Sequence, residues 1–565
     1  MTRDINLRYV DETYDDDGLL KTYSVHYPDD FNFGYDIVDD IAINDPERRA
    51  LVWCDDKGHE RIFTFADIKR MSDKTANYLT SKGVKKGDMV LVVLKHNYQF
   101  WYVSVALHKM GAVIIPATFM LKKHDIEYRI NSASIKAAIV TSDAPVWQEF
   151  DKAEDVPTLK IKCMTNSQFN GPCPPGWDDF DKGVEEASDK WERVNTHVKD
   201  MMMIYFTSGT SGNPKMAVHD HSYPIGHILT AKHWHCVVPD GLHWTVAETG
   251  WAKNAWGKLY GQWIMEAGLF VYEHEKFDPV AVMDLIEKYR ITTFCCPPTM
   301  FRMYCNAGLE GHDLSSLTHT NIAGEALNSD TFEKWYEATG LKLMEGFGQS
   351  ETTVLVGNLR GMTPKPGSMG RPSPQYKIDI VDENGRSCPP SVVGEIVVGI
   401  EPHPAGIFVG YLHDRQKTRA TLYGGFHHTG DLAWKDEDGY YWYYGRNDDV
   451  IKSSGYRISP FEIESVLLKH PCCLECAVTA VPDPVRGQIV KASIILRQGF
   501  EPSDELKKEL QNYVKQETAP YKYPRAVEFV KELPKSISGK IKRVDIRKQD
   551  QKAAEAGGMK NERDQ

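Results

Sequence analysis

The chain has 565 residues, which is too long for one hydrophobic core, so two or more domains are expected. Its 67 basic and 79 acidic residues give a formal net charge of −12, which excludes a general attraction to nucleic acid or to an anionic membrane surface. No apolar run approaches the ~18–20 residues that span a bilayer. The N-terminal segment MTRDINLRYVDETYDDDG is acidic where a signal or transit peptide would be basic and apolar, so the sequence predicts a cytoplasmic protein.

From about 35 to 200, and again from 260 to 345, stretches with helical periodicity alternate with short β-rich runs. The predicted elements include helices over 71–83 and 281–290 and strands over 89–95 and 291–298. This alternation is typical of an α/β domain with largely parallel sheets and covering helices.

After about residue 375 the pattern changes to period-2 strands joined by turn residues, as in KIDIVDENGR and EIVVGI. We interpret 375–445 as a β-rich subdomain of the large α/β domain. From about 446 onward the pattern predicts a smaller α+β domain, with helices over 461–470 and 503–517 and a polar tail at the end.

Eleven cysteines are scattered along the chain, with one cluster at Cys472, Cys473 and Cys476. The Cys-x-x-Cys spacing is compatible with a metal or redox site, but a zinc site needs a second pair nearby and none follows. We interpret the three as buried, reduced thiols that behave as small hydrophobes.

The segment YFTSGTSGNPKMAVHDH follows an apolar run that predicts a strand, and it concentrates hydroxyls, glycines and one lysine. Glycines let backbone N–H groups approach a phosphate, hydroxyls add hydrogen bonds, and the lysine supplies a point charge. The spacing differs from the nucleotide-kinase P-loop. The residues predicted to bind phosphate are Thr207, Ser208, Gly209, Thr210, Ser211, Gly212 and Lys215.

Further motifs follow in order: AGEALN at 323–328, GFGQSE at 346–351, TGD at 429–431, GRNDDVIKSSGYRISP at 445–460 and PKSISGKIKR at 534–543. Together with the phosphate segment they resemble the adenylate-forming superfamily of acyl-CoA synthetases, adenylation domains and firefly luciferase, over almost the entire chain. The overall pattern is most similar to medium-chain acyl-CoA synthetases, including prokaryotic ones acting on branched acids.

The resemblance implies that a carboxylic acid reacts with ATP to give an acyl-adenylate and diphosphate, and that coenzyme A then displaces AMP. Mg²⁺ would accompany ATP. The implied organisation is an AMP-binding domain over 1–445, a hinge at 446–450 and a mobile C-terminal domain over 451–565 that rotates between the two half-reactions.

The resemblance also implies roles for individual residues in nucleotide binding. Glu351 is the metal-associated position, Asp431 accepts both ribose hydroxyls, and Arg446 also meets the ribose. Phe347 stacks on adenine, and Glu345 meets its amino group. The remaining nucleotide positions are Gly324, Glu325, Ala326, Gly346, Gly348, Gln349 and Ser350.

Lys540 matches the superfamily's adenylation lysine, whose ammonium stabilises the charge that develops as the carboxylate attacks the α-phosphate. Asp448 matches the hinge. In the second orientation Ser454, Gly455 and Arg457 are candidates to contact coenzyme A.

For the acyl group, Gly348 stands where acetyl-CoA synthetases have a pocket-shortening tryptophan, which predicts room for a medium or branched chain. Trp251, Lys253, Trp256 and Cys295 lie in segments that approach the acyl site in this superfamily, and Lys253 is a candidate to meet a polar substrate group.

Two alternatives stay open on the sequence, and the residues present argue against a third. An aryl-CoA ligase for benzoate-like acids would share every motif, and a stand-alone adenylation enzyme would load a carrier protein instead of coenzyme A. A nucleotide-binding module without catalysis would have lost Lys540, Glu351 or Lys215, all of which are present. The expected partners are small molecules, and a homodimer is compatible with the resemblance.

Overall fold

A computed structural model describes residues 3–207, 213–324, 329–454, 456–483, 485–535 and 541–555. These residues fold into two compact units. The first contains the described residues up to 207 together with 214–378 and 398–427, and the second contains 379–397 and the described residues from 428 onward.

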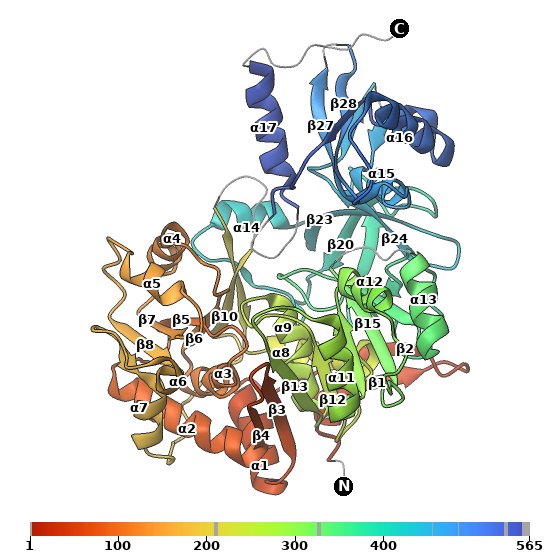
Figure 1. The fold of residues 1–565 in the computed structure, drawn as a ribbon. Helices are drawn as coiled ribbons and strands as arrows, with labels where there is room; N and C mark the ends of the chain where they lie inside the picture. The colour runs from red at the N-terminus through yellow and green to blue at the C-terminus, as the bar shows by residue number, and fades with distance from the viewer. Residues whose placement is uncertain are drawn as a thin grey trace. The chain divides into compact units, whose positions relative to one another are not determined.

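Two large sheets organise the first unit, and each is mainly parallel (Figure 1). Among the described residues, one sheet has eight strands in the order β21 (Gly410–Tyr411), β11 (Lys215–Asp220), β10 (Met201–Thr207), β6 (Val113–Pro116), β5 (Met89–Val93), β7 (Ala137–Thr141), β8 (Ile161–Thr165) and β9 (Asp178–Asp179). The other has nine, in the order β18 (Arg371–Pro372), β17 (Val356–Gly357), β16 (Leu343–Phe347), β15 (His319–Ala323), β14 (Thr293–Cys296), β12 (Leu242–Thr245), β13 (Gly268–Glu273), β3 (Arg49–Asp55) and β4 (Glu60–Thr64). In the eight-stranded sheet, the neighbouring strands from β10 to β9 run parallel. In the nine-stranded sheet, the neighbouring strands from β16 to β3 run parallel. These parallel strands confirm the predicted α/β class.

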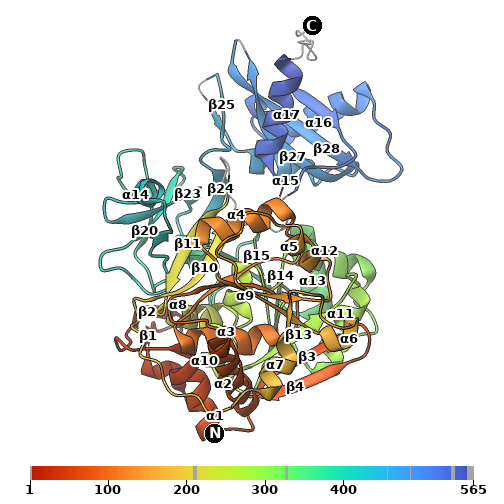
Figure 2. The same cartoon turned by 90° about the vertical axis from the view of Figure 1, so that its left-hand side faces the viewer.

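Helices form three layers: one packs against both sheets, and one covers the opposite face of each sheet. One buried cluster joins both sheets to the helices α2 (Phe65–Ser81), α3 (Gln99–Met110), α8 (Tyr223–Leu229) and α10 (Tyr260–Ile264). The opposite face of the eight-stranded sheet packs on α4 (Lys123–Ala133) and α5 (Val146–Asp151). The opposite face of the nine-stranded sheet packs on α11 (Pro279–Tyr289), α12 (Pro298–Ala307) and α13 (Ser329–Thr339), and Figures 1 and 2 show these outer helices on their respective sheets.

Helix α2 begins earlier than its sequence pattern predicts, at Phe65 instead of residue 71. Thr64 caps it in a reciprocal arrangement with Asp67, whose backbone N–H donates to the Thr64 hydroxyl at 3.2 Å while the Asp67 carboxylate accepts from the Thr64 N–H at 3.1 Å. Satisfying these N-terminal donors fixes the start of the helix.

Short antiparallel strands account for the β-rich pattern after residue 375. Strands β19 (Ile378–Val381), β20 (Gly394–Gly399) and β23 (Phe426–Lys435) are neighbours in that order, and β24 (Tyr441–Arg446) pairs with β23. Two hairpin strands follow, β25 (Ile451–Ser453) and β26 (Tyr456–Ile458).

The second unit continues with an α+β layer. Strand β28 (Gly487–Leu496) pairs with β27 (Cys473–Asp483) on one side and β29 (Ala526–Phe529) on the other. Helices α15 (Pro460–Leu467) and α16 (Asp504–Glu517) share a buried cluster with one face of this sheet, and α17 (Arg543–Glu555) packs on the other face, as Figure 1 shows. Cys472, Cys473 and Cys476 are buried free thiols in the first of these clusters.

Among the described helices, none combines the length and the apolar character that a membrane crossing requires.

Candidate active site

The predicted phosphate segment connects two paired strands of the first unit. Thr207 ends β10 and Lys215 begins β11, and the two residues are direct antiparallel partners. Ser208, Gly209, Thr210, Ser211 and Gly212 lie outside the described residues. The Tyr128 hydroxyl donates to the carbonyl of Pro214 at 3.0 Å, which anchors the second strand where it enters the sheet.

Tyr411, which the sequence motifs did not predict, contacts two predicted site residues. These are Lys215, predicted to bind phosphate, and Glu351, predicted to bind the metal. The ammonium of Lys215 lies 5.3 Å from the ring centroid of Tyr411, and the hydroxyl of Tyr411 donates to Oε1 of Glu351 at 2.9 Å. Tyr411 reaches this position because β21 pairs with β11, through the partners Ala217 and Tyr411. A cation, a phenol and a carboxylate therefore lie in a row that starts at Lys215, the first residue of β11.

The backbone around Glu351 is held from two directions. The N–H of Phe408 donates to the Glu351 carbonyl at 2.8 Å, and Nε2 of His219 lies 2.8 Å from the carbonyl of Ser350. Burial lowers the pKa of His219 to about 4, so the ring is neutral and Nε2 donates its proton. These bonds fix the backbone at Ser350 and Glu351, and the side chain of Glu351 is half-buried.

Glu351 fits the requirements of Mg²⁺. Its carboxylate remains partly accessible, and the bond to Tyr411 occupies one lone-pair site of one oxygen. Mg²⁺ takes one or two protein carboxylates and completes its shell with phosphate and water oxygens. The described residues contain no group of three or more acidic, histidine or cysteine side chains that could hold a metal on their own.

The predicted adenine residues meet at the carboxyl ends of two neighbouring parallel strands. Ala323 at the end of β15 is the partner of Gly346 in β16, so Gly324 and Phe347 come next to each other at the same sheet edge. Ligands of open α/β sheets bind outside these strand ends. Glu325 and Ala326 lie outside the described residues.

Glu345 is the most perturbed acid at this edge. Burial raises its pKa to about 8, because desolvation disfavours the charged form. Within the described part of the chain, its Oε2 atom has no hydrogen-bond partner. An orphaned carboxyl of this kind suits a ligand that offers both a donor and an acceptor.

Two indoles pack beneath the glycines that follow Glu345. A Cβ added to Gly346 would lie 2.5 Å from the ring of Trp234, and one added to Gly348 would lie 2.4 Å from Cη2 of Trp256. Trp256 is held by a bond from Nε1 to the carbonyl of Thr352 at 3.2 Å. The space that Gly348 leaves open is therefore filled by Trp256, which refines the expectation that the glycine by itself gives room for a longer chain.

The other residues predicted to line the acyl site lie on the helix of Trp256, directly before it, or in the same buried cluster as Trp256. Helix α9 (Ala252–Gly257) carries both Trp256 and Lys253, and the ammonium of Lys253 donates to the Ala323 carbonyl at 3.2 Å. Burial raises the pKa of the Cys295 thiol, and nearby Lys253 opposes that shift. Trp251 stands directly before α9, where its N–H donates to the Glu248 carbonyl at 3.2 Å. Burial raises the pKa of Glu248 to about 7.

In the second unit, Asp431 and Arg446 are cross-strand partners in β23 and β24. Nη1 of Arg446 lies 3.4 Å from Oδ2 of Asp431, and the Tyr443 hydroxyl donates to Oδ1 at 3.0 Å. Tyr443 was not predicted, although the register of the hairpin contains it.

The predicted hinge and coenzyme A residues follow in the same unit. Asp448 lies 3.6 Å from Nε of Arg446. Ser454 has a left-handed backbone with φ of 49° and donates its N–H to the Arg486 carbonyl at 2.9 Å. Arg457 donates to Glu383 at 2.8 Å. Gly455 and Lys540 lie outside the described residues.

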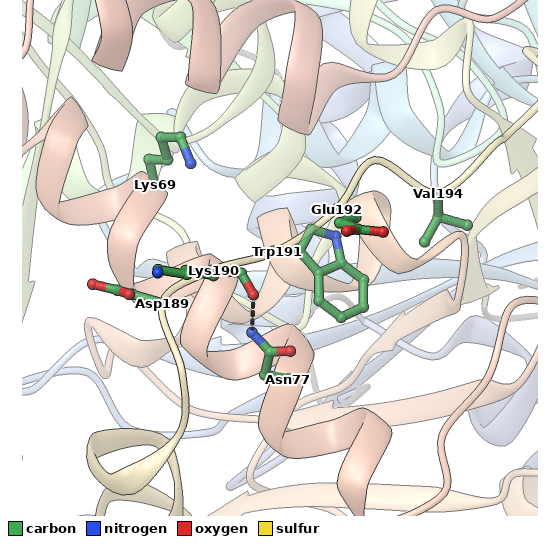
Figure 3. A pocket seen from close by; sticks show the side chains of 7 residues that line it. All are labelled: Lys69, Asn77, Asp189, Lys190, Trp191, Glu192 and Val194. Carbon is green, nitrogen blue, oxygen red and sulfur yellow. Dashed lines mark hydrogen bonds between the residues drawn. The ribbon is translucent and has the colours of Figure 1, made fainter.

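A separate open hollow of about 720 Å³ lies between α2 and the segment that leads toward β10 (Figure 3). The amide of Asn77 donates to the Lys190 carbonyl at 2.9 Å across its floor. It is lined by Lys69, Asn77, Asp189, Lys190, Trp191, Glu192 and Val194, and it contains none of the residues predicted from the sequence.

Comparisons with known proteins identify the family of the chain. A family model described as "AMP-binding enzyme" matches residues 38–412, and one described as "AMP-binding enzyme C-terminal domain" matches 462–540. Acyl-coenzyme A synthetase ACSM3, mitochondrial, of Mus musculus is 39% identical over 94% of this chain and 93% of its own length. Acyl-coenzyme A synthetase ACSM5, mitochondrial, of Homo sapiens is 41% identical over 93% and 91%.

Solved structures show the same fold. The crystal structure of the anthranilate CoA ligase AuaEII in complex with anthranoyl-AMP has a TM-score of 0.83 and 28% identity, and the match covers 94% of this chain and 99% of that one. The Brucella canis acyl-CoA synthetase has a TM-score of 0.70 and 30% identity, covering 93% and 95%.

The relatives also correct two expectations. They are mammalian, so they do not match the expected likeness to prokaryotic enzymes, and they are named mitochondrial, which contradicts the predicted cytoplasmic location. That prediction used the acidic character of a short N-terminal segment, whereas the fold and site carry no information about compartment. Family models that match residues 38–412 and 462–540 and relatives near 40% identity over most of the chain agree: the chain belongs to the family of AMP-binding enzymes, as an acyl-CoA synthetase.

Proposed function

We propose that this acyl-CoA synthetase activates a medium-chain or branched carboxylic acid and uses Mg²⁺ with ATP. The row formed by Lys215, Tyr411 and Glu351 is the observation that supports this proposal most strongly, because it combines a cation for phosphate with a carboxylate for a metal. The named relatives support the acyl-CoA product.

In the first half-reaction, a carboxylate oxygen of the acid attacks the α-phosphorus of ATP, and diphosphate leaves. Lys215 supplies positive charge to the phosphates, and Glu351 would hold Mg²⁺, which neutralises phosphate charge when bound. Lys540 would stabilise the negative charge that develops at the α-phosphate. In the second half-reaction the sulfur of coenzyme A attacks the acyl carbonyl, and AMP leaves.

Separate groups of residues would recognise the adenine and the ribose of the nucleotide. Phe347 offers a face for adenine, and the buried, protonated Glu345 can donate to a ring nitrogen while it accepts from the amino group. Asp431, held by Tyr443 and Arg446, would accept the ribose hydroxyls.

The acyl group would lie beside Trp256 and Lys253, near the end of β15. Trp256 limits the depth of this region at Gly348, which favours medium and branched chains over long ones. Coenzyme A would approach Ser454, Gly455 and Arg457 after rotation at Asp448. A homodimer stays a prediction.

An aryl-CoA ligase is the second candidate, supported by the likeness to the anthranilate CoA ligase. Incubation with ATP, Mg²⁺, coenzyme A and a panel of linear, branched and aromatic acids distinguishes the two. The proposal predicts diphosphate and AMP release with the highest kcat/KM for medium or branched acids. Highest kcat/KM for benzoate-like acids would favour the second candidate, and no diphosphate release from any acid would contradict both.

A further inference from the structure

Four charged side chains of the second unit form an ion cluster at the start of α17. Arg543, the first residue of that helix, contacts Glu464 of α15 three times, at 2.6, 2.8 and 3.2 Å. Arg547, one turn later, donates to Oδ1 of Asp449 at 2.6 Å, and Nη1 of Arg543 lies 3.7 Å from the other oxygen of Asp449. Arg543 therefore contacts both carboxylates, and Arg547 contacts that of Asp449.

The cluster is largely withdrawn from water. The side chains of Glu464 and Asp449 are 9% and 13% exposed. Burial raises the pKa of Glu464 while Arg543 opposes the shift, and the N–H of Val478 donates to the same carboxylate at 2.7 Å. Such pairs are costly to break on one side but geometrically specific, because a guanidinium meets a carboxylate in a fixed fork.

The ion cluster joins residues that are distant in sequence and that lie next to two proposed functional residues. Asp449 directly follows the proposed hinge residue Asp448, and Arg543 follows the proposed catalytic Lys540 by three positions. The chain between these two points includes the whole sheet of β27, β28 and β29. The ion cluster thus provides a short connection between two points that are far apart along the chain.

The backbone leading into α17 is also held in place. Lys535 and Ile541 form an antiparallel bridge, and the N–H of Lys542 donates to the Pro534 carbonyl at 2.8 Å. Ile541 packs against the cluster of Ala477, Leu533 and Ile546. The described residues on both sides of 536–540 are therefore tied to the same body as the ion cluster.

We infer that Asp449, Glu464, Arg543 and Arg547 form a latch that fixes the chain after Lys540 to the chain after the hinge, so that rotation at Asp448 is transmitted to Lys540. The inference rests on the proposed function and makes Arg543 and Arg547 positioning residues for adenylation. The latch has no such role in the second half-reaction, because the coenzyme A candidates Ser454 and Arg457 follow the hinge directly and do not depend on α17.

Asp449→Asn tests the latch with the least damage, because it removes the ion pair of Arg547 and the weaker pair of Arg543 but leaves the Arg543–Glu464 fork. A displacement of about 1 Å at a reacting group can cost about 100-fold in rate. We expect single-turnover diphosphate release to fall by about 10- to 100-fold, with an almost unchanged KM for ATP, and acyl transfer from supplied acyl-AMP to coenzyme A to stay within about twofold of the parent.

Matched variants separate positioning from stability. Asp550→Asn removes an ion pair between the same helix and Lys491 of β28, about one turn beyond Arg547 and outside the latch. It should leave both half-reactions near the parent rate. Arg547→Gln should reproduce the loss seen with Asp449→Asn, and Arg547→Lys, which keeps the charge, should recover a large part of it.

The latch is refuted if Asp449→Asn lowers both half-reactions equally, affects only acyl transfer, or leaves adenylation within about twofold of the parent. It is equally refuted if Asp550→Asn produces the same selective loss. Lys540→Ala serves as the separate check of the proposed function: if that variant retains adenylation, the assignment of the lysine fails, whatever the latch variants show.

Discussion

Glu345 shows how burial sets the chemistry of a single residue. Its folded pKa of about 8 lies above the value of 4.5 expected in an unfolded chain. Between these two values the unfolded state loses the proton that the folded state keeps, so stability falls as pH rises through this window. The loss amounts to roughly 1 kcal/mol per pH unit.

We therefore predict that Glu345→Gln stabilises the protein increasingly from pH 5.5 to pH 7.5, relative to the parent. The amide keeps the acceptor for an adenine amino group but cannot ionise. Urea unfolding at the two pH values measures the difference. An equal effect of the substitution at both values would show that Glu345 ionises normally in the folded protein.

Tyr411 is expected to act through Glu351. Removing its hydroxyl leaves Oε1 of Glu351 without that donor, and losing the partner of a metal ligand typically weakens metal binding by 10- to 100-fold. Tyr411→Phe should raise the Mg²⁺ concentration needed for half-maximal diphosphate release by about 10-fold, while KM for the acid changes little. The exposed Tyr423 offers a control as Tyr423→Phe. An unchanged Mg²⁺ requirement would contradict the assignment.

The packing of Gly348 against Trp256 makes a prediction about chain length. Gly348→Trp must displace the Trp256 indole, because even a Cβ would approach it to 2.4 Å. The acyl region would shorten, and each methylene that is no longer buried costs ~0.8 kcal/mol. The ratio of kcat/KM for hexanoate over propionate should therefore fall several-fold per carbon. An unchanged ratio would place the acyl chain elsewhere.

At the scale of elements, the N-terminal cap of α2 tests how local chemistry fixes a helix. Thr64→Ala removes the hydroxyl that accepts from Asp67, which typically costs about 1 kcal/mol of stability. Chemical denaturation should report this loss without a change in diphosphate release. A change of a few tenths of a kcal/mol would mean that α2 is held by packing alone.

The sequence predicted elements best where periodicity was strong, and their ends less well. The predicted strand at 89–95 appears as β5 over Met89–Val93, and the predicted helix at 281–290 as α11 over Pro279–Tyr289. The start of α2 was missed because its first residues belong to a capping arrangement and not to the apolar repeat. Tyr443 could have been found by extending the hairpin register from Asp431 and Arg446.

Tyr411 and Trp234 could not be found in the same way. Tyr411 joins the site through the pairing of β21 with β11, and Trp234 reaches Gly346 from η3 (Thr230–Trp234), a segment distant in sequence. Both positions depend on tertiary packing, on which local sequence patterns carry no information. The sequence motifs predicted the reaction. The structure identifies the side chains that contact the residues of those motifs.

For the whole molecule, we propose that one chain carries out two successive half-reactions and that Lys540 serves the first. The most direct measurement is a single-turnover assay of each half-reaction in the parent and in Lys540→Ala, with diphosphate release followed in one and acyl-CoA formation from supplied acyl-AMP in the other. We predict that adenylation falls by a factor of 100 or more, about 3 kcal/mol or more in the barrier, while acyl transfer is largely preserved. Equal loss of both half-reactions, or preserved adenylation, would contradict the account.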